Sequence, residues 1–289
     1  MKQTKGINTW DFDYLRQLVH QHSAVVLDGD KTYLAELHLQ PIAEAAGFAT
    51  ITDLIAYLRH HPVSDLHIQA IEALVTNETS FFRDTYPFEA LKKLVLPELI
   101  KKRRIERSLN IWCAACSHGQ EPYSIAILIR EYFPLLANWS VQIIASDFSS
   151  KVLDRAKKGC YNQLEIKRGL PKNLRDRYFK LLDNEWQIQD EIRKNIDFRQ
   201  LNLIHSWSDL PKIDIILLRN VLIYFDIATK KALLTKVKQQ LNSDGYLFLG
   251  SGETTINLHQ SFERVQFDKS IFYRLRPVAS DNAAIAPRK

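Results

Sequence analysis

The stretch 109–130 constrains the fold of this chain more than any other. A short apolar run, LNIWCAA, ends in a turn of small and polar residues, and EPYSIAILIR follows directly, with Ile125, Leu128 and Ile129 at helical spacing. Pro122 suits the first turn of a helix. A strand, a tight loop and a helix in this order form the first unit of an open α/β sheet. Ligands of such sheets bind beyond the carboxyl ends of the strands.

The loop of this unit contains a single glycine, Gly119, so the dinucleotide-binding pattern G-x-G-x-x-G is absent. Small residues at Ala114, Ala115 and Ser117 would let a ligand approach the backbone, with less room for a pyrophosphate. Taken alone, the unit is a weak indication of a nucleotide site. Its weight depends on the residues that stand at the ends of the later strands.

Strand and helix patterns alternate after this unit. Val141–Ser149 predicts a buried strand that ends in Asp147 and leads into a helix, and Ile213–Asp226 predicts a strand that ends at Arg219–Asn220. A helix over 229–241, closed by Ser243–Gly245, and two further strands, YLFLGSGE and SIFYRL, follow. This order predicts a doubly wound, mostly parallel sheet with an antiparallel edge in an α/β domain over 109–276.

One segment, 159–200, breaks the alternation. Its runs RYFKLL and EWQIQ flank a turn-forming pair, Asp183–Asn184, which predicts a small antiparallel β-subdomain inserted between units of the sheet. The polar, alanine-rich tail 277–289 is predicted to be disordered.

Residues 1–76 predict a separate, all-α domain of four short helices. The first places Phe12, Leu15, Leu18 and Val19 on one face, and Pro41 is expected to kink or split the second. The fourth is expected to direct Ile68, Ile71, Leu74 and Val75 inward. Six of the nine histidines lie here without a cysteine or carboxylate cluster, which favours surface or half-buried positions over metal binding: His20, His22, His38, His60, His61 and His67.

Residues 77–108 connect the two domains. NETSFFRD runs from polar residues straight into Phe81, Phe82 and Arg83, and a helix begins near Pro87. A lid over the strand ends and a linker whose phenylalanines fill the interface fit this pattern equally well. The basic run KKRRIER at 101–107 has no interleaved aromatic residues to stack bases, which favours a solvated helix end over nucleic-acid binding.

Composition indicates a cytoplasmic protein. With 289 residues the chain is long enough for two domains, and no window of about 18 apolar residues predicts membrane insertion. No signal-peptide region is evident at the N-terminus, and three cysteines cannot build a disulfide framework. Cys113 and Cys116, with His118 nearby, could form a redox pair or a zinc site, but a packing role is favoured and no metal is predicted.

Asp147 is the sharpest single feature of the sequence. A carboxylate at the end of the second strand of such a sheet is placed to accept hydrogen bonds from both hydroxyls of a ribose. Acidic ends of buried strands are uncommon without a partner, because a desolvated charge is costly. Glu121, at the start of the first helix, could bind a ligand amine or simply favour the helix dipole.

Four stretches give the chain a resemblance to the bacterial chemoreceptor glutamate O-methyltransferases, the CheR family, from about Trp10 to Leu275. They are NETSFFRD, IWCAACSHGQEPYSIAI, ASDFSSKVLDRAKKGCY and LLRNVLIYFD. The second matches the family pattern A-x-S-x-G-x-E-P-Y-S, and together the four are highly specific. The resemblance implies an N-terminal helical domain joined to a Rossmann-like domain that binds S-adenosylmethionine and carries a small β-subdomain.

The resemblance also implies S-adenosyl-L-methionine as cofactor, S-adenosyl-L-homocysteine as product, and methyl transfer to glutamates of a chemoreceptor's cytoplasmic domain by a monomer. Arg83 could hold the carboxylate and Tyr224 could orient it, although Tyr224 could also be a core residue. The resemblance implies that the cofactor is bound by Asn77, Thr79, Arg83, Glu121, Asp147, Asn202, Leu203, Arg219 and Asn220.

One departure from the family concerns the partner. The family's second helix carries several arginines that meet an acidic receptor helix, whereas here it has only Lys31 as a basic residue, together with Glu36, Pro41 and Glu44. We therefore expect no docking through a basic face of this domain. Two alternatives stay open: a methyltransferase of this fold that acts on another carboxylate, and a non-catalytic adaptor that binds the cofactor or its product. A nucleic-acid methyltransferase is disfavoured because no N-P-P-Y-type motif follows the fourth strand.

Overall fold

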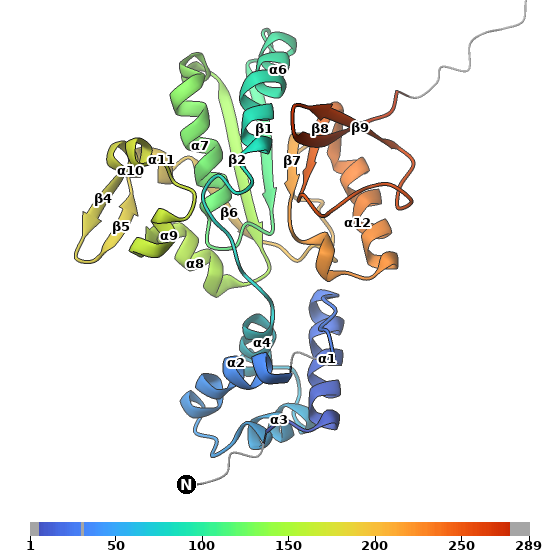
Figure 1. Ribbon diagram of the computed structural model, residues 1–289. Coiled ribbons are helices and arrows are strands. Elements are labelled where there is room, and N and C mark those ends of the chain that lie inside the picture. Colours follow the sequence, from blue (N-terminus) through green and yellow to red (C-terminus); the bar gives the residue numbers. More distant parts are fainter. Residues whose placement is uncertain (1–5, 30–31, 278–289) are drawn as a thin grey trace, which may run out of the picture.

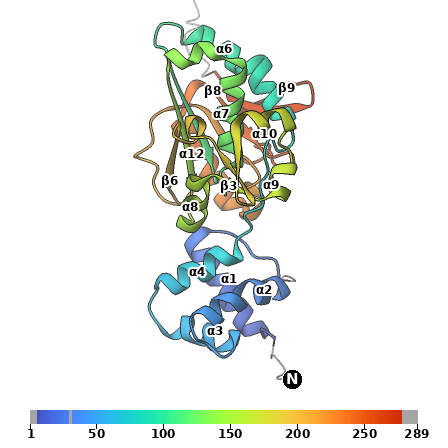
Figure 2. The same cartoon turned by 90° about the vertical axis from the view of Figure 1, so that its left-hand side faces the viewer.

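The computed structural model describes residues 6–29 and 32–277, which form a helical domain and an α/β domain. The predicted disorder of the tail concerns residues that, except for Pro277, lie outside this described part. In Figure 1 the helical domain lies below the sheet, and Figure 2 shows the same separation from the side. No helix among the described residues is long and apolar enough to cross a membrane.

The helical domain contains α1 (Thr9–Ser23), α2 (Thr32–Ala45), α3 (Ile51–His60) and α4 (Asp65–Leu74). Side chains of Asn8 and Thr50 cap α1 and α3 by accepting hydrogen bonds from backbone N–H groups of the first turn. The four helices enclose a core of fully buried aliphatic residues, among them Leu15, Leu39 and Leu54. The amphipathic pattern of the sequence thus produces the expected small bundle.

Three details of this domain differ from the sequence-based expectations. Pro41 does not split α2, which continues through it to Ala45. Ile68 faces outward, with 37% of its surface exposed, because α4 turns its other side to the bundle. His67 is fully buried rather than superficial, and its ring bonds the backbone N–H of Ser64 and the carbonyl of Leu58. This histidine therefore ties α4 to the end of α3.

A connecting segment of helices leads from the helical domain to the sheet. It consists of α5 (Tyr86–Ala90), a π-helical turn (Leu91–Val95) and α6 (Leu96–Lys102). Leu91 and Val95 are buried against the α/β domain. The helix predicted from about Pro87 is therefore present, with a change of winding in its middle.

The main sheet has seven strands in the order β6-β2-β1-β7-β8-β10-β9. The strands β6, β2, β1, β7 and β8 are parallel, and β10 and β9 add the antiparallel edge. The strand bounds are β1 (Ser108–Ala114), β2 (Ser140–Asp147), β6 (Ile196–Gln200), β7 (Ile213–Leu218), β8 (Leu241–Leu249), β9 (Phe262–Phe267) and β10 (Ser270–Leu275). The doubly wound, Rossmann-like α/β fold predicted from the sequence is confirmed.

Helices cover the sheet: α7 (Gln120–Tyr132), α8 (Ser150–Lys158) and α12 (Ile227–Gln240), with short 3₁₀ turns at Pro134–Asn138 and Leu222–Tyr224. From β1 the chain builds outward through β2 to β6, then returns to the other side of β1 with β7 and β8. The strand order therefore reverses between β1 and β7. Such a switch point opens a crevice at the carboxyl ends of the strands.

The prediction that Ser243–Gly245 closes a helix was wrong, because these residues lie inside β8. Two side-chain interactions hold this part of the chain beside β7: Asn242 Nδ2 donates to Asp214 Oδ1 at 2.8 Å, and Arg103 pairs with Asp244 at 2.6 Å. A glycine fits at Gly245 because an added Cβ would lie 3.0 Å from the Asp214 carbonyl oxygen. The glycine marks a close strand approach here rather than a helix end.

A second, three-stranded sheet forms the small subdomain that projects to the left in Figure 1. Its strands are β3 (Cys160–Tyr161), β4 (Phe179–Leu182) and β5 (Glu185–Ile188), in the order β3-β5-β4, with α9 (Gln163–Lys167), α10 (Lys172–Tyr178) and α11 (Asp190–Arg193) around them. Asp183 and Asn184 form the expected hairpin turn. The predicted range 159–200 was too long, since its last residues form β6 of the main sheet. Strand β9 was not predicted.

The helical domain packs directly on the α/β domain. Leu18, Val19 and Ile71 belong to the same buried cluster as the residues that cover one face of the sheet. Val25 forms an isolated antiparallel bridge with Phe225, and Asn202 Nδ2 donates to the His22 carbonyl at 2.6 Å. The end of α1 and the residues after it are therefore part of the wall near the carboxyl ends of the strands.

Candidate functional site

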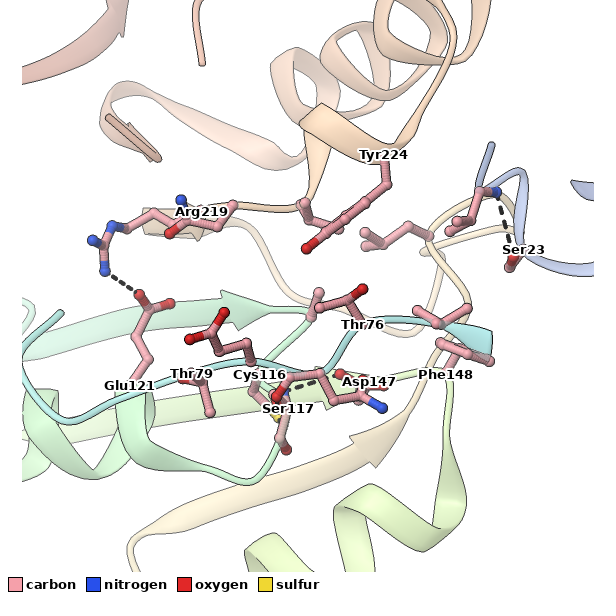
Figure 3. Close-up of a pocket in the computed structure, with 18 of the residues that line it drawn as sticks. Ser23, Thr76, Thr79, Cys116, Ser117, Glu121, Asp147, Phe148, Arg219 and Tyr224 are labelled. Atoms are coloured by element: carbon pink, nitrogen blue, oxygen red, sulfur yellow. Dashed lines mark hydrogen bonds and ion pairs between the residues drawn. The ribbon is translucent and has the colours of Figure 1, made fainter. Parts of the chain in front are cut away.

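A cavity lies at the carboxyl ends of β1, β2 and β7, where the strand order reverses. Its space, including the open mouth, is about 920 Å³. Figure 3 shows Tyr224 and Arg219 on one side of this space and Thr79, Ser117 and Asp147 on the other. All the site residues predicted from the sequence line it: Asn77, Thr79, Arg83, Glu121, Asp147, Asn202, Leu203, Arg219, Asn220 and Tyr224.

The loop between β1 and α7 forms the floor of the cavity. Ala115, Ser117 and Gly119 all have positive φ, at 56°, 51° and 90°. A Cβ at Gly119 would also lie 3.1 Å from the Cβ of Ala156, so this position favours glycine twice over. Left-handed backbone at non-glycine residues costs about 1 kcal/mol or more and clusters at functional sites. The small residues at this loop thus allow a sharply folded backbone next to the ligand space.

Asp147 ends β2 and is held by backbone groups alone. Its Oδ2 accepts from the Ser117 N–H at 3.0 Å and its Oδ1 from the Ser149 N–H at 3.1 Å. Among the described residues no cation pairs with it, and burial raises the pKa of Asp147 although these N–H bonds oppose the shift. Each oxygen keeps acceptor capacity on the cavity side, which suits two neighbouring ribose hydroxyls.

Arg219 and Glu121 form a buried ion pair across the switch point. Arg219 Nη1 donates to Glu121 Oε2 at 2.5 Å, and Nη2 donates to Asp84 Oδ2 and to the Arg83 carbonyl, both at 2.8 Å. Burial raises the pKa of Glu121, while Arg219 opposes the shift. The Nε–H of Arg219 is buried and has no acceptor within the described part of the chain. A ligand oxygen would satisfy this donor.

The connecting segment 77–83 runs along the cavity: Asn77, Thr79 and Arg83 line it, as the lid hypothesis expects, and Phe81 is buried, as the linker hypothesis also expects. Ser117 Oγ donates to the Asn77 carbonyl at 2.7 Å, and the Phe82 N–H donates to Ser124 Oγ at 3.0 Å. Phe81 packs edge-on against Tyr161 of the small subdomain at a centroid distance of 5.0 Å. The phenylalanine pair is thus an anchor, and it leaves the polar residues of the segment facing the ligand space.

Arg83 and Tyr224 retain donors that the protein does not use. Arg83 makes one side-chain hydrogen bond within the described residues, from Nη1 to the Glu78 carbonyl at 2.9 Å. The ring of Tyr224 points into the cavity in Figure 3, and its hydroxyl has no hydrogen bond in the described part of the chain. Its backbone carbonyl accepts from the Val26 N–H at 2.8 Å. Tyr224 is therefore a wall residue and not a core residue.

Several wall residues were not predicted as site residues. Ser23 and Val25 come from the helical domain, and no local pattern distinguishes them because they reach the cavity only through domain packing. Ser117 is part of the family pattern, and its backbone N–H donates a hydrogen bond to Asp147. Cys116 also lines the cavity, and burial raises the pKa of Cys113 and Cys116 well above the usual range. Both thiols are free and buried, as a packing role requires.

The arrangement defines an α/β protein with a nucleoside-type pocket at the switch point and a helical domain that completes its wall. Residues 77–271 match the family described as CheR methyltransferase, SAM binding domain, and residues 10–75 match CheR methyltransferase, all-alpha domain. The chain belongs to the CheR methyltransferase family, and its cofactor is S-adenosyl-L-methionine.

Curated relatives match almost the whole chain. The similarity to chemotaxis protein methyltransferase 1 of Pseudomonas aeruginosa is 39% identity over 270 residues, or 92% of this chain and 98% of the relative. Chemotaxis protein methyltransferase Cher2 of Pseudomonas putida is 37% identical over the same shares of both chains. Chemotaxis protein methyltransferase 1 of Vibrio cholerae is 37% identical over 91% of this chain and 96% of the relative.

The residues present fit this cofactor. Asp147 offers two open acceptor positions for the ribose, and the buried Nε–H of Arg219 lacks an acceptor that a ligand carboxylate would provide. Charged side chains of both signs line the cavity, the anions Glu78, Glu121 and Asp147 and the cations Arg83 and Arg219, which suits a cofactor that carries both positive and negative groups. The individual contacts of Asn77, Thr79, Asn202 and Leu203 with the cofactor stay predictions.

Proposed function

We propose that the protein transfers methyl groups from S-adenosylmethionine to glutamate side chains of a chemoreceptor-like signalling protein in the cytoplasm, forming glutamate methyl esters. The observation that carries this proposal is the pair of unused donors, on Arg83 and Tyr224, in the wall of a cofactor cavity. The names of the relatives, chemotaxis protein methyltransferases, support the same substrate class.

When bound, the cofactor would supply an electrophilic methyl group on a sulfonium. The carboxylate oxygen of the substrate would form the new bond to this methyl group, and the departing sulfur would keep the electron pair of the carbon–sulfur bond. A free glutamate has a pKa of about 4.3, so the carboxylate is already ionised at neutral pH and no general base is required. The protein's task is to align the carboxylate and to exclude water.

Arg83 can bind a carboxylate through the donors that Glu78 does not occupy, and a guanidinium suits a two-pronged contact. The Tyr224 hydroxyl can donate a hydrogen bond to the same group. The segment 77–83 and the bridge between Val25 and Phe225 close the cavity on two sides. These elements restrict the entry of water beside the reacting groups.

The test is incubation of the protein with labelled S-adenosylmethionine and a panel of chemoreceptor cytoplasmic fragments. We expect incorporated label that mild base releases, as methyl esters are released, and no label where the acceptor glutamates are replaced by glutamine. Arg83→Ala should lower the rate about 100-fold, because misplacement of the nucleophile by about 1 Å has that effect. Arg104→Ala, which changes an exposed arginine far from the cavity, is the matched control.

Each alternative has its own outcome in this experiment. Label that resists mild base would contradict ester formation, and base-labile label on a small molecule but on no receptor would show a different carboxylate substrate. Binding of S-adenosylhomocysteine without methylation of any acceptor would identify an adaptor.

A further inference from the structure

Glu253 concentrates three backbone hydrogen bonds on one carboxylate without lining the cavity. It lies in the turn that follows β8. Its Oε2 accepts from the N–H groups of Asn220 at 2.8 Å and Gly250 at 2.6 Å, and its Oε1 accepts from the Ile223 N–H at 3.2 Å. Two of these three donors belong to the segment 219–224, which carries Asn220 and Tyr224 into the cavity wall.

Asn220 and Gly250 lie close together beside the Glu253 carboxylate. Asn220 has a φ of 58°, so its backbone is left-handed and its N–H has left the ladder of the sheet. A Cβ at Gly250 would lie 2.6 Å from Asn220 Nδ2 and 2.8 Å from Glu253 Oε2, which makes glycine the residue that permits this approach. A strained segment persists only where its surroundings fix it, and here the fixing group is Glu253.

The segment 219–224 is also held at its two ends. Arg219 is tied to Glu121 and Asp84, and the Tyr224 carbonyl accepts from the Val26 N–H. Glu253 is the group that holds the middle, because it bonds Asn220 and Ile223 and so sets where the Tyr224 side chain begins. No other side chain among the described residues bonds these two N–H groups.

We propose that Glu253 is a positioning residue for methyl transfer, which fixes Asn220 and, through Ile223, Tyr224 against the reacting groups. This inference rests on the proposed function for the role of Tyr224. A carboxylate is needed because both oxygens must accept. The amide nitrogen of a glutamine would face a backbone N–H, and an aspartate would fall short by one methylene.

The kinetic test compares Glu253→Gln and Glu253→Ala with Asp244→Asn, a control near the start of β8, at the end of that strand remote from Glu253. Asp244 pairs with Arg103 and lies far from the cavity. We expect kcat to fall about 10-fold in Glu253→Gln and about 100-fold in Glu253→Ala, with a much smaller change in KM for S-adenosylmethionine, because the displaced groups act on alignment. The control should lower Tm and leave kcat unchanged.

Amide hydrogen exchange supplies a readout that does not depend on activity. The N–H groups of Asn220 and Ile223 should exchange faster in Glu253→Gln, while those of Ser117 and Ser149, which Asp147 holds, should not change. If no receptor is methylated by the wild-type protein, the proposed function fails, and exchange still decides whether Glu253 fixes the segment. Unchanged exchange at both amides, or an equal loss of kcat in Asp244→Asn, would overturn the inference.

Discussion

The buried aspartates at the two ends of the parallel sheet differ in their hydrogen-bond partners. At the amino end, Asp214 of β7 is 3% exposed and receives hydrogen bonds from Arg103, the Asn110 N–H and Asn242. Arg103 also pairs with Asp244 at 2.6 Å. At the carboxyl end, Asp147 is 5% exposed and receives two backbone N–H bonds and no cation.

The difference distinguishes a carboxylate that the protein itself pairs with a cation from one that it leaves partly unpaired, which we predict to bind the ligand. The hydrogen bond with Arg103 holds the pKa of Asp244 below its usual range, whereas burial raises the pKa of Asp147. Charge is stabilised at the amino end by the protein itself. At the carboxyl end the protein leaves acceptors of Asp147 open, and we expect the ribose of the cofactor to occupy them. The comparison teaches that an incompletely paired buried acid marks the site more clearly than burial alone.

The largest effect is expected for Arg103→Ala, which tests whether the amino end of the sheet is purely structural. Removing the cation leaves Asp214 buried beside two weaker donors, and breaking such a pair costs about 3 kcal/mol of unfolding free energy. Denaturant unfolding should show this loss. The affinity for S-adenosylhomocysteine, measured by calorimetry, should equal that of the wild-type protein. A large loss of affinity would show that the two ends are not independent.

Asp147→Asn should produce the opposite pattern. The amide keeps one acceptor oxygen for the backbone but loses charged hydrogen bonds to the ribose, which lowers the affinity for S-adenosylhomocysteine by about 1.5–3 kcal/mol. Unfolding free energy should fall by only about 1 kcal/mol, for one lost backbone bond. Calorimetry and denaturant unfolding on the same samples check both values. Unchanged affinity in a folded variant would remove Asp147 from the site.

Lowering the pH should change the stability contributed by Asp147 and by Asp244 in opposite directions. The raised pKa of Asp147 contributes stability that is present below its unfolded-state pKa and lost as the pH rises through the folded value. The lowered pKa of Asp244 contributes stability above the unfolded-state pKa that is lost as the pH falls through the folded value. If cofactor binding requires the ionised Asp147 carboxylate, as we predict, the affinity should decrease as the pH decreases, by at most about tenfold per pH unit for one proton.

The measurement is calorimetry with S-adenosylhomocysteine from about pH 7.5 to about pH 5. The pH slope should be smaller in Asp147→Asn than in the wild-type protein. Burial also raises the pKa of Glu121, and we expect its titration to account for the pH dependence of affinity that is left in Asp147→Asn. An identical slope in both proteins would contradict the assignment of this titration to Asp147.

The smallest expected effect is that of salt on receptor methylation. The exposed cations Lys101, Arg104 and Arg107 gather at the amino end, while the exposed positions of α2 include Tyr33 and Leu37. If docking occurs near the site, rates at sub-saturating receptor should change by about twofold or less between low and physiological salt. Strong inhibition, relieved when Arg104 is neutralised, would place docking at the amino end instead.

Periodicity was enough to predict the strands β1, β2, β7, β8 and β10, the helical domain and the presence of the small subdomain, because each depends on local patterns of apolar residues. Asp147 was recognisable for the same reason, as a charge at the end of a buried strand. Residues 196–200 were included in the inserted subdomain and not recognised as strand β6 of the main sheet, because their partner β2 lies about 50 positions earlier in the chain. Glu253 and Val25 were not predicted as functional residues for a related reason. Their roles depend on contacts with the segment 219–225, and the sequence around them does not indicate these contacts.

The bridge between Val25 and Phe225 has a consequence for how the protein is made. The hydrogen bond from Asn202 to His22 spans 180 positions, and contacts of such separation form late in folding. At a synthesis rate of about 5–20 residues per second, the end of α1 leaves the ribosome about 10–40 s before the residues of the α/β domain that dock on it. During this interval the end of α1 lacks its partners from the α/β domain. The cavity becomes complete only when β7 and the turn after it have been synthesised.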